Sequence, residues 1–224
     1  MLALLCGCGS SACPPGTFDD PKQDALGVAA ASGNVADIID LVQSGADPNA
    51  QGDGGFTALM CAQHSGHDAA FGELLQLGAN LEIADDSGRT ALWLAVVMDD
   101  PRFLKIALEH GADPNTRYRG SNEPILFNAL VPEGLPRVSL LVAAGADVNA
   151  TDVYGVTALN EAVGTELYDI ALYLLEHGAD PTTPDRWGQS ALSILESHQP
   201  VSGTKEAEDR QLLMSALVSK GFLE

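Results

Sequence analysis

The sequence is poor in aromatic and basic residues. Only 5% of its 224 residues are Phe, Trp or Tyr, and 11 Lys and Arg stand against 31 Asp and Glu, for a formal net charge of −20. Such a charge repels phosphate backbones and excludes nucleic acid as a partner, whereas it attracts basic proteins. It also keeps a protein soluble, and the sequence leaves both interpretations open. Because aromatic residues are few, the 46% of residues that are hydrophobic are mainly aliphatic and small, which favours closely packed helices.

Long apolar runs and paired cysteines are missing as well. No stretch is long and apolar enough to span a membrane. Three of the four cysteines lie within the first 13 residues and Cys61 stands alone, so we expect no disulfide framework. No second Cys/His pair has the spacing of a zinc site.

The first eight residues, MLALLCGC, resemble the end of a bacterial lipoprotein signal. Leu5-Cys6-Gly7-Cys8 is similar to a lipobox, whose last cysteine receives lipid, and the Ser-, Gly- and Pro-containing residues behind it are typical of a tether. The basic first segment of a signal peptide is missing, and the apolar run is shorter than the roughly 7–15 residues of a signal core. The alternative to an export signal is a frayed cytoplasmic terminus that contains cysteines. We expect lipidation at Cys8, a periplasmic location with a lipid anchor, and a signal-like segment and flexible tether over residues 1–23.

Two short phrases recur along the chain at one spacing. A Gly-Ala-Asp or Gly-Ala-Asn block begins at Gly45, Gly78, Gly111, Gly145 and Gly178, so its steps are 33 or 34 residues. A second phrase, Thr-Ala-Leu in three cases, keeps the same register at Thr57, Thr90, Glu123, Thr157 and Ser190. Two phrases with one period indicate a tandem repeat whose members pack on their neighbours.

These phrases resemble the ankyrin-repeat family, in its bacterial type, whose repeat is a β-turn followed by two antiparallel helices. The resemblance implies an all-α fold, an ankyrin-repeat solenoid of stacked helix-turn-helix units with β-hairpin fingers. It implies one domain over residues 24–224. We number its repeats 1 to 6 and expect them at 24–50, 51–83, 84–116, 117–150, 151–183 and, as a C-terminal cap, 184–224. An insertion from Ser197 to Asp209 precedes a final helix around Arg210 to Ser219 in that cap.

The recurring residues have physical reasons. Thr57, Thr90 and Thr157 are predicted N-caps, whose hydroxyls accept hydrogen bonds from the first helical turn. Pro124 falls at the first helical position of repeat 4, where its missing N–H costs nothing. Gly178 is expected to end a second helix in the left-handed conformation.

The family usually docks its partners on the concave side, formed by the finger tips and the exposed face of the first helices. Carried over by position, this face holds Cys61 and His64 in repeat 2 and a run of apolar residues in repeats 3 and 4. An exposed apolar patch usually marks an interaction site. A helix face misplaced by one residue would instead put these side chains in the core. The partner-binding residues predicted here are Trp93, Leu94, Val97, Met98, Phe127, Leu130 and Val131.

The finger tips are the second predicted partner-binding site. Arg, Tyr and Trp are enriched at binding hot spots, and several of the few basic residues stand here. Ordinary turn composition is the alternative, with Trp187 folded back onto its neighbour. The successive fingers carry Arg117, Tyr118 and Arg119, then Tyr154, then Arg186 and Trp187.

No pattern in the sequence indicates catalysis or a metal. His110 and His177 each close a second helix, where they are expected to bond the last carbonyls. His64 and His67 are three residues apart but have no third ligand. No nucleophile is paired with a base, and no Gly-rich phosphate loop occurs. We therefore expect no enzyme, no metal and no cofactor.

The predicted function is a non-catalytic protein–protein interaction module. The lipobox-like start and the ankyrin resemblance suggest a periplasmic immunity or self-protection protein that binds and inhibits a toxic or cell-wall-active enzyme. The expected partner is another protein, basic or an enzyme, with membrane contact only through the lipid anchor. We expect a monomer when the protein is unbound. A general scaffold or adaptor, cytoplasmic or exported, is the alternative, and a secreted host-directed effector is a third.

Overall fold

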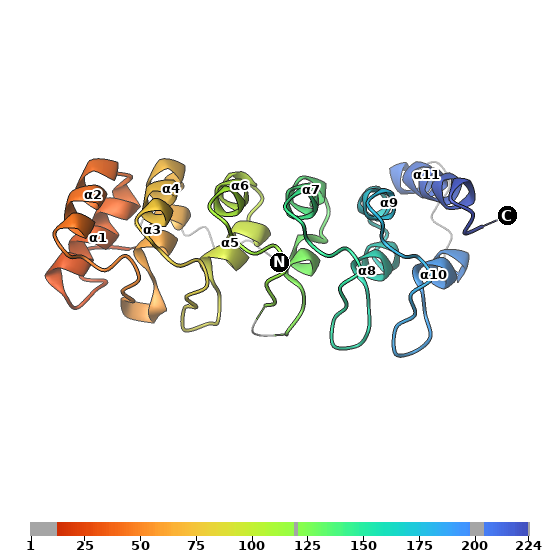
Figure 1. Ribbon diagram of the computed structural model, residues 1–224, viewed down its shortest axis with the longest axis horizontal. Coiled ribbons are helices and arrows are strands. Elements are labelled where there is room, and N and C mark those ends of the chain that lie inside the picture. The colour runs from red at the N-terminus through yellow and green to blue at the C-terminus, as the bar shows by residue number, and fades with distance from the viewer. Residues whose placement is uncertain (1–12, 119–120, 198–203, 224) are drawn as a thin grey trace. The chain divides into compact units, whose positions relative to one another are not determined.

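The computed structural model describes residues 13–118, 121–197 and 204–223. The chain divides into two compact halves, Met1–Ala112 and Asp113–Glu224, each a stack of helix pairs joined by projecting loops (Figure 1). The helices of the N-terminal half are α1 Pro21–Ser32, α2 Val35–Gln43, the 3-10 turn η1 Asp53–Gly55, α3 Ala58–His64, α4 Asp68–Gln76, α5 Ala91–Val97 and α6 Arg102–Glu109. The helices of the C-terminal half are the 3-10 helix η2 Ile125–Ala129, α7 Leu135–Ala143, α8 Ala158–Gly164, α9 Tyr168–Glu176, α10 Ala191–Ser197 and α11 Lys205–Ser219.

Within each half the first helices of successive repeats pack in one row and the second helices in another. In the N-terminal half α1 contacts α3 and α3 contacts α5, while α2, α4 and α6 form the second row. In the C-terminal half the first row is η2, α8 and α10, and the second is α7, α9 and α11. The prediction of an all-α ankyrin-like stack is confirmed. In the described fingers, isolated β-bridges such as Thr151 to Thr157 take the place of strands.

The short first helices depend on their N-caps. The hydroxyls of Thr57, Thr90 and Thr157 each accept a hydrogen bond from the N–H three residues further on, at 3.0–3.3 Å. Because these helices have only seven residues, one satisfied N–H is a large share of their free ends. Gly178 ends α9 with φ of 93°, so the predicted caps and the predicted left-handed glycine are confirmed.

Repeat 4 departs from the pattern. Pro124 is the N-cap of η2 and not the first helical residue, and the five residues after it wind as a 3-10 helix. In the turn that follows, the residue with positive φ is a glutamate and not a glycine. Glu133 has φ of 61°, and Glu166 in repeat 5 has the same value. Gly66 holds the matching position in repeat 2 with φ of 79°, a conformation that glycine adopts more readily than glutamate.

An asparagine in the finger connects each of several repeats to the next. The Asn149 side chain donates to the Gly178 carbonyl at 3.0 Å and accepts from the Asp180 N–H at 2.8 Å. Asn49 and Asn115 make the same two bonds to the blocks that follow them. The amide thus bridges a helix end and the start of the next finger, which fixes the spacing between consecutive helix pairs.

Replacing Asn149 with Ala should lower the free energy of unfolding by about 1–3 kcal/mol, because two backbone groups lose their partner. Urea unfolding followed by circular dichroism measures the change. Glu176→Ala is the matched control, since Glu176 is exposed and its loss should stay within about 0.5 kcal/mol. Equal stability of the two variants would contradict a connecting role for Asn149.

The residues before α1 form a strap, residues 13–20, that is fixed to the first two repeats. A disulfide joins Cys13 to Cys61 in α3, with the two Cα atoms 5.6 Å apart and both residues buried. Phe18 is buried where a side chain at Gly27 would collide with its ring. The Asp24 carboxylate accepts from the Phe18 N–H at 3.2 Å.

This strap corrects three expectations. Cys61 does not stand alone, since its partner Cys13 lies 48 residues earlier and outside the repeat. Cys61 is fully buried and is not part of an exposed helix face. Residues 13–23 are strap and helix and not a flexible tether, since α1 begins at Pro21 with Asp20 as its N-cap. Cys8 lies outside the described residues.

Removing the disulfide should destabilise the N-terminal half. In a background of Cys6→Ser and Cys8→Ser, the change Cys13→Ser should cost about 2–4 kcal/mol, because the unfolded chain regains the freedom of the closed loop. Urea unfolding measures the loss. Reducing the Cys6→Ser, Cys8→Ser protein with dithiothreitol should lower its stability by the same amount. Peptide mapping without reductant should recover the Cys13 and Cys61 peptides joined; two separate peptides would contradict the pairing.

The last helix is longer than expected. Helix α11 begins at Lys205, five residues before the predicted Arg210. Thr204 is its N-cap and accepts from the Ala207 N–H at 3.3 Å. The charged residues at its start, placed in an insertion by the sequence, form its exposed first turn instead. Leu213 and Leu217 are buried where α11 packs against α9.

Candidate functional site

The apolar patch predicted on the first helices is only partly exposed. Leu94 is 4% exposed and Leu130 is 9% exposed, so both belong to the core of their halves. Leu94 turns inward because α5 is covered by α3 and α6. Leu130 follows a 3-10 helix, whose three residues per turn rotate it away from the predicted face. Val131 is exposed as predicted.

The other members of this patch are half-buried in the two halves. Trp93 and Val97 lie in α5, Met98 is its C-cap, and Phe127 lies in η2. The structure therefore leaves these four partly accessible, which is what a binding surface requires. Their role in partner binding stays a prediction.

The finger of repeat 4 uses its arginine for structure. Arg117 Nη1 donates to the carbonyls of Asn122 at 2.9 Å and Thr151 at 3.1 Å. Tyr118 is half-buried, and its N–H donates to the Glu123 carbonyl. Gln51 makes equivalent bonds in repeat 2, to Gly55 and Ala84, so Arg117 holds neighbouring fingers together. Arg119 lies outside the described residues.

The fingers of repeats 5 and 6 bring two aromatic rings together at the surface. Tyr154 is 47% exposed and Trp187 is 66% exposed, and their ring centroids are 5.8 Å apart. The Arg186 N–H donates to the Tyr154 carbonyl at 2.9 Å, which ties the two fingers to each other. Val153, next to Tyr154, is 57% exposed. Trp187 therefore lies against the ring of the neighbouring finger, as the alternative had it, but remains on the surface.

The guanidinium of Arg186 lies against both rings. Its Cζ is 5.0 Å from the Tyr154 centroid and 5.4 Å from the Trp187 centroid, within the range of cation–π attraction. We call Tyr154, Arg186 and Trp187 the finger cluster. The sequence shows Arg186 beside Trp187, but the third member follows from the repeat: Tyr154 and Trp187 are 33 positions apart, so the period places them on adjacent fingers.

Aspartates hold the tips of these fingers in shape. One carboxylate oxygen of Asp85, Asp152 and Asp185 accepts from the N–H groups two and four residues further on, at 2.8–2.9 Å. Such turns fix the backbone on which Tyr154 and Trp187 stand. In repeat 3 the aspartate also forms an ion pair, with Arg89 Nη2 2.7 Å from Asp85 Oδ2.

The Asp85 carboxyl is held in its charged form. Burial by itself raises the pKa of this carboxyl, but hydrogen bonds from the Arg89 side chain and backbone, together with the Arg89 charge, bring the net pKa below its ordinary value. A depressed pKa in the folded state means that stability is present above the unfolded pKa and is lost as pH falls through the folded one.

Acidification below about pH 4 should therefore weaken repeat 3, and Asp85→Asn should remove that part of the pH dependence. Urea unfolding at several pH values between neutral and acid measures both effects. Asp86→Asn, at the exposed neighbouring position, is the control and should keep the wild-type slope. The same slope for all three proteins would contradict a stabilising charge on Asp85.

Two histidines serve helix ends. His110 Nδ1 lies 2.8 Å from the Ile106 carbonyl oxygen and His177 Nδ1 lies 2.7 Å from that of Tyr173, as predicted. Among the described residues no three His, Cys, Asp or Glu side chains gather as for a metal ion. The helices of this part of the chain are all too short or too polar to cross a bilayer.

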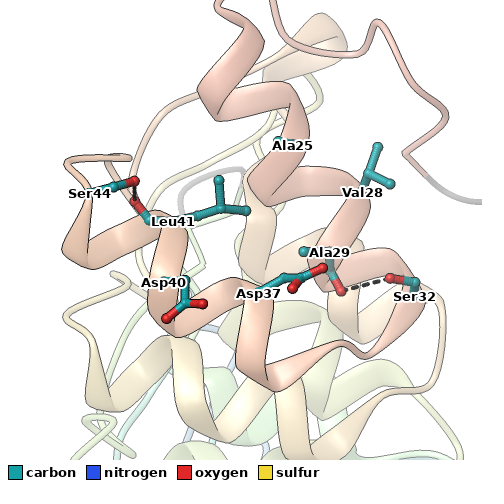
Figure 2. A pocket seen from close by; sticks show the side chains of 8 residues that line it. All are labelled: Ala25, Val28, Ala29, Ser32, Asp37, Asp40, Leu41 and Ser44. Atoms are coloured by element: carbon teal, nitrogen blue, oxygen red, sulfur yellow. Dashed lines mark hydrogen bonds between the residues drawn. The ribbon is translucent and has the colours of Figure 1, made fainter.

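A groove of about 600 Å³ lies between α1 and α2 in the N-terminal half (Figure 2). Val28 and Leu41 supply its apolar sides, and Asp37 and Asp40 stand along one edge. The Ser32 hydroxyl at its end already donates to a helix carbonyl. The groove is the open face of the first helix pair, and its acidic edge suits the water-facing end of a stack.

Comparison with known proteins identifies the repeat. A family model for ankyrin repeats (3 copies) matches residues 26–118, and another for ankyrin repeats (many copies) matches residues 141–195. Human ankyrin repeat and SOCS box protein 6 is 34% identical over 122 residues, which is 50% of this chain. The chain spans only 29% of that protein's length.

Solved structures agree with the fold. The ankyrin repeat domain ABAYE2397 from Acinetobacter baumannii AYE superposes with a TM-score of 0.71 at 28% identity, covering 85% of this chain and 96% of that one. A chain in the complex of Bd0816, a predatory endopeptidase from Bdellovibrio bacteriovorus, with the immunity protein Bd3460 gives a TM-score of 0.64 at 27% identity. That match covers 84% of this chain and 97% of the other.

Proposed function

We propose that this protein, which belongs to the ankyrin-repeat family of protein–protein interaction scaffolds, protects its own cell by binding and inhibiting a toxic or cell-wall-active enzyme in the periplasm. The scaffold has no catalytic role in this proposal. The enzyme is held on the finger tips and on the partly exposed first-helix residues, and inhibition follows from covering its active site.

The exposed finger cluster carries the proposal. Trp187 and Tyr154 present large aromatic surfaces to solvent, and the Arg186 N–H bond to Tyr154 keeps both fingers in place before any partner arrives. Trp, Tyr and Arg are enriched among the few residues that carry most of the binding energy at protein interfaces, and a rigid arrangement lowers the entropy lost on binding. The cluster thus combines the residue types and the preorganisation of a binding anchor.

The disulfide supports an exported protein. Buried structural disulfides such as Cys13–Cys61 persist in oxidising compartments, including the bacterial periplasm, and are rare in the cytoplasm. We propose a periplasmic location on this ground, with lipid attachment at Cys8 as its anchor. The lipobox-like order Leu5-Cys6-Gly7-Cys8 supports the attachment site.

Charge supports a basic partner. The net charge of −20 attracts basic enzymes and speeds their encounter at low salt. The similarity to a chain in an endopeptidase–immunity protein complex supports the choice of an enzyme as the partner.

Affinity capture from a periplasmic extract tests the proposal. The tagged wild-type protein should retain a hydrolase whose activity falls on binding. Trp187→Ala should weaken that complex by at least about 2 kcal/mol, or roughly thirtyfold in Kd, because it removes the largest exposed anchor. Titration calorimetry with the captured enzyme measures the loss.

Leu212→Ala is the matched control, because Leu212 is 57% exposed on α11 and lies away from the fingers in the sequence. It should bind as the wild type does. An enzyme that is retained with unchanged activity would replace inhibition by an adaptor role. Recovery of no enzyme at all would refute the proposal.

A further inference from the structure

We propose that Arg186 in the finger cluster is a receptor for a carboxylate, an Asp or Glu side chain on a loop of the partner protein. This inference deepens the proposed function and rests on it for the identity of the partner as an enzyme. It specifies the chemical group that the finger cluster recognises, a carboxylate, and it assigns the recognition to Arg186.

Arg186 lacks the ion pair that Arg89 and Arg102 have. Arg89 pairs with Asp85 at 2.7 Å and Arg102 pairs with Asp100 at 2.6 Å. The Arg186 side chain is exposed and forms no hydrogen bond or ion pair with any described residue. The donors of this guanidinium are therefore available to another molecule.

The aspartates of its own two fingers bond the turn backbone and do not pair with Arg186. One Asp152 oxygen accepts from the Tyr154 and Val156 N–H groups, and one Asp185 oxygen accepts from the Trp187 and Gln189 N–H groups. These bonds hold both carboxylates against the turn backbone. Each aspartate keeps its second oxygen, but neither forms an ion pair with Arg186.

The two rings position the guanidinium for a planar ligand. Tyr154 and Trp187 lie 5.0 and 5.4 Å from Arg186 Cζ, and stacking on aromatic rings leaves the N–H edges of a guanidinium free. The fork of N–H donors matches the two oxygens of a carboxylate. The two exposed rings add apolar surface beside it, which favours a carboxylate next to an apolar residue.

The net charge of this protein determines which other charged residues the partner loop carries. A broadly acidic protein would be repelled by the charge of −20. The partner loop therefore combines one carboxylate with neighbouring Lys or Arg. Basic residues bring the loop in, and the Arg186–carboxylate pair fixes its register, since complementary charges set orientation as well as rate.

Two blocked peptides test the inference on the full-length protein without knowledge of the partner. The probe is acetyl-Lys-Leu-Glu-Lys-amide, and its control is acetyl-Lys-Leu-Gln-Lys-amide, in which an uncharged amide replaces the carboxylate. Proton–nitrogen NMR follows the Arg186 Nε–H and the Trp187 indole N–H during titration. The Glu peptide should move both signals and bind about tenfold more tightly than the Gln peptide, because only the carboxylate accepts two charged hydrogen bonds.

Two substitutions test whether the difference between the peptides arises at Arg186. Arg186→Gln should abolish the difference between the peptides, and Arg186→Lys should keep only a small part of it, because an ammonium lacks the planar fork. Arg102→Gln, which removes an exposed arginine from the N-terminal half, should leave it intact. Equal binding of both peptides, or an unchanged difference in Arg186→Gln, would overturn the carboxylate receptor. Unchanged chemical shifts elsewhere show that each variant is folded.

The same variant separates the two proposals. If the wild type captures and inhibits an enzyme and Arg186→Gln binds it equally well, the proposed function stands and the carboxylate receptor falls. If the Glu peptide binds through Arg186 but no enzyme is captured from the periplasmic extract, the receptor stands and the immunity function falls.

Discussion

The contact between one helix pair and the next is the interaction on which this structure depends. A single pair of short helices, the first of only seven residues in repeats 2, 3 and 5, buries too little surface to be stable alone. Stacking buries both faces, and the finger asparagines fix the distance between neighbours. The exposed side chains at the finger tips are separate from these bonds, so substitutions of Tyr154 or Trp187 change the surface with little effect on the core.

That separation explains the finger cluster. The scaffold includes the aspartate turns and the backbone bond from Arg186 to Tyr154. The Tyr154 and Trp187 side chains project from this scaffold and contact each other. A different finger position has an arginine with a structural role in repeat 4, where Arg117 bonds two carbonyls. One type of side chain thus stabilises the stack in one finger and remains free for a ligand in another.

Much of the fold could be predicted from the sequence because a period of 33 or 34 residues determines which positions become neighbours. The N-caps at Thr57, Thr90 and Thr157 followed from it. The rotation of a short helix did not: an error of one residue is about 100°, enough to bury Leu94. The disulfide could not be predicted, since Cys13 lies outside the repeat and no period relates it to Cys61. Arg186 was named among the finger residues, but its free donors are visible only in three dimensions.

The position of the strap limits how far the folded protein can move from an anchor. Five residue steps separate Cys8 from Cys13, and a fully extended chain of that length spans at most about 18 Å. With the disulfide formed, a lipid on Cys8 would hold α3 close to the bilayer surface instead of on a tether of fifteen residues. The first two repeats would then remain within reach of the membrane face.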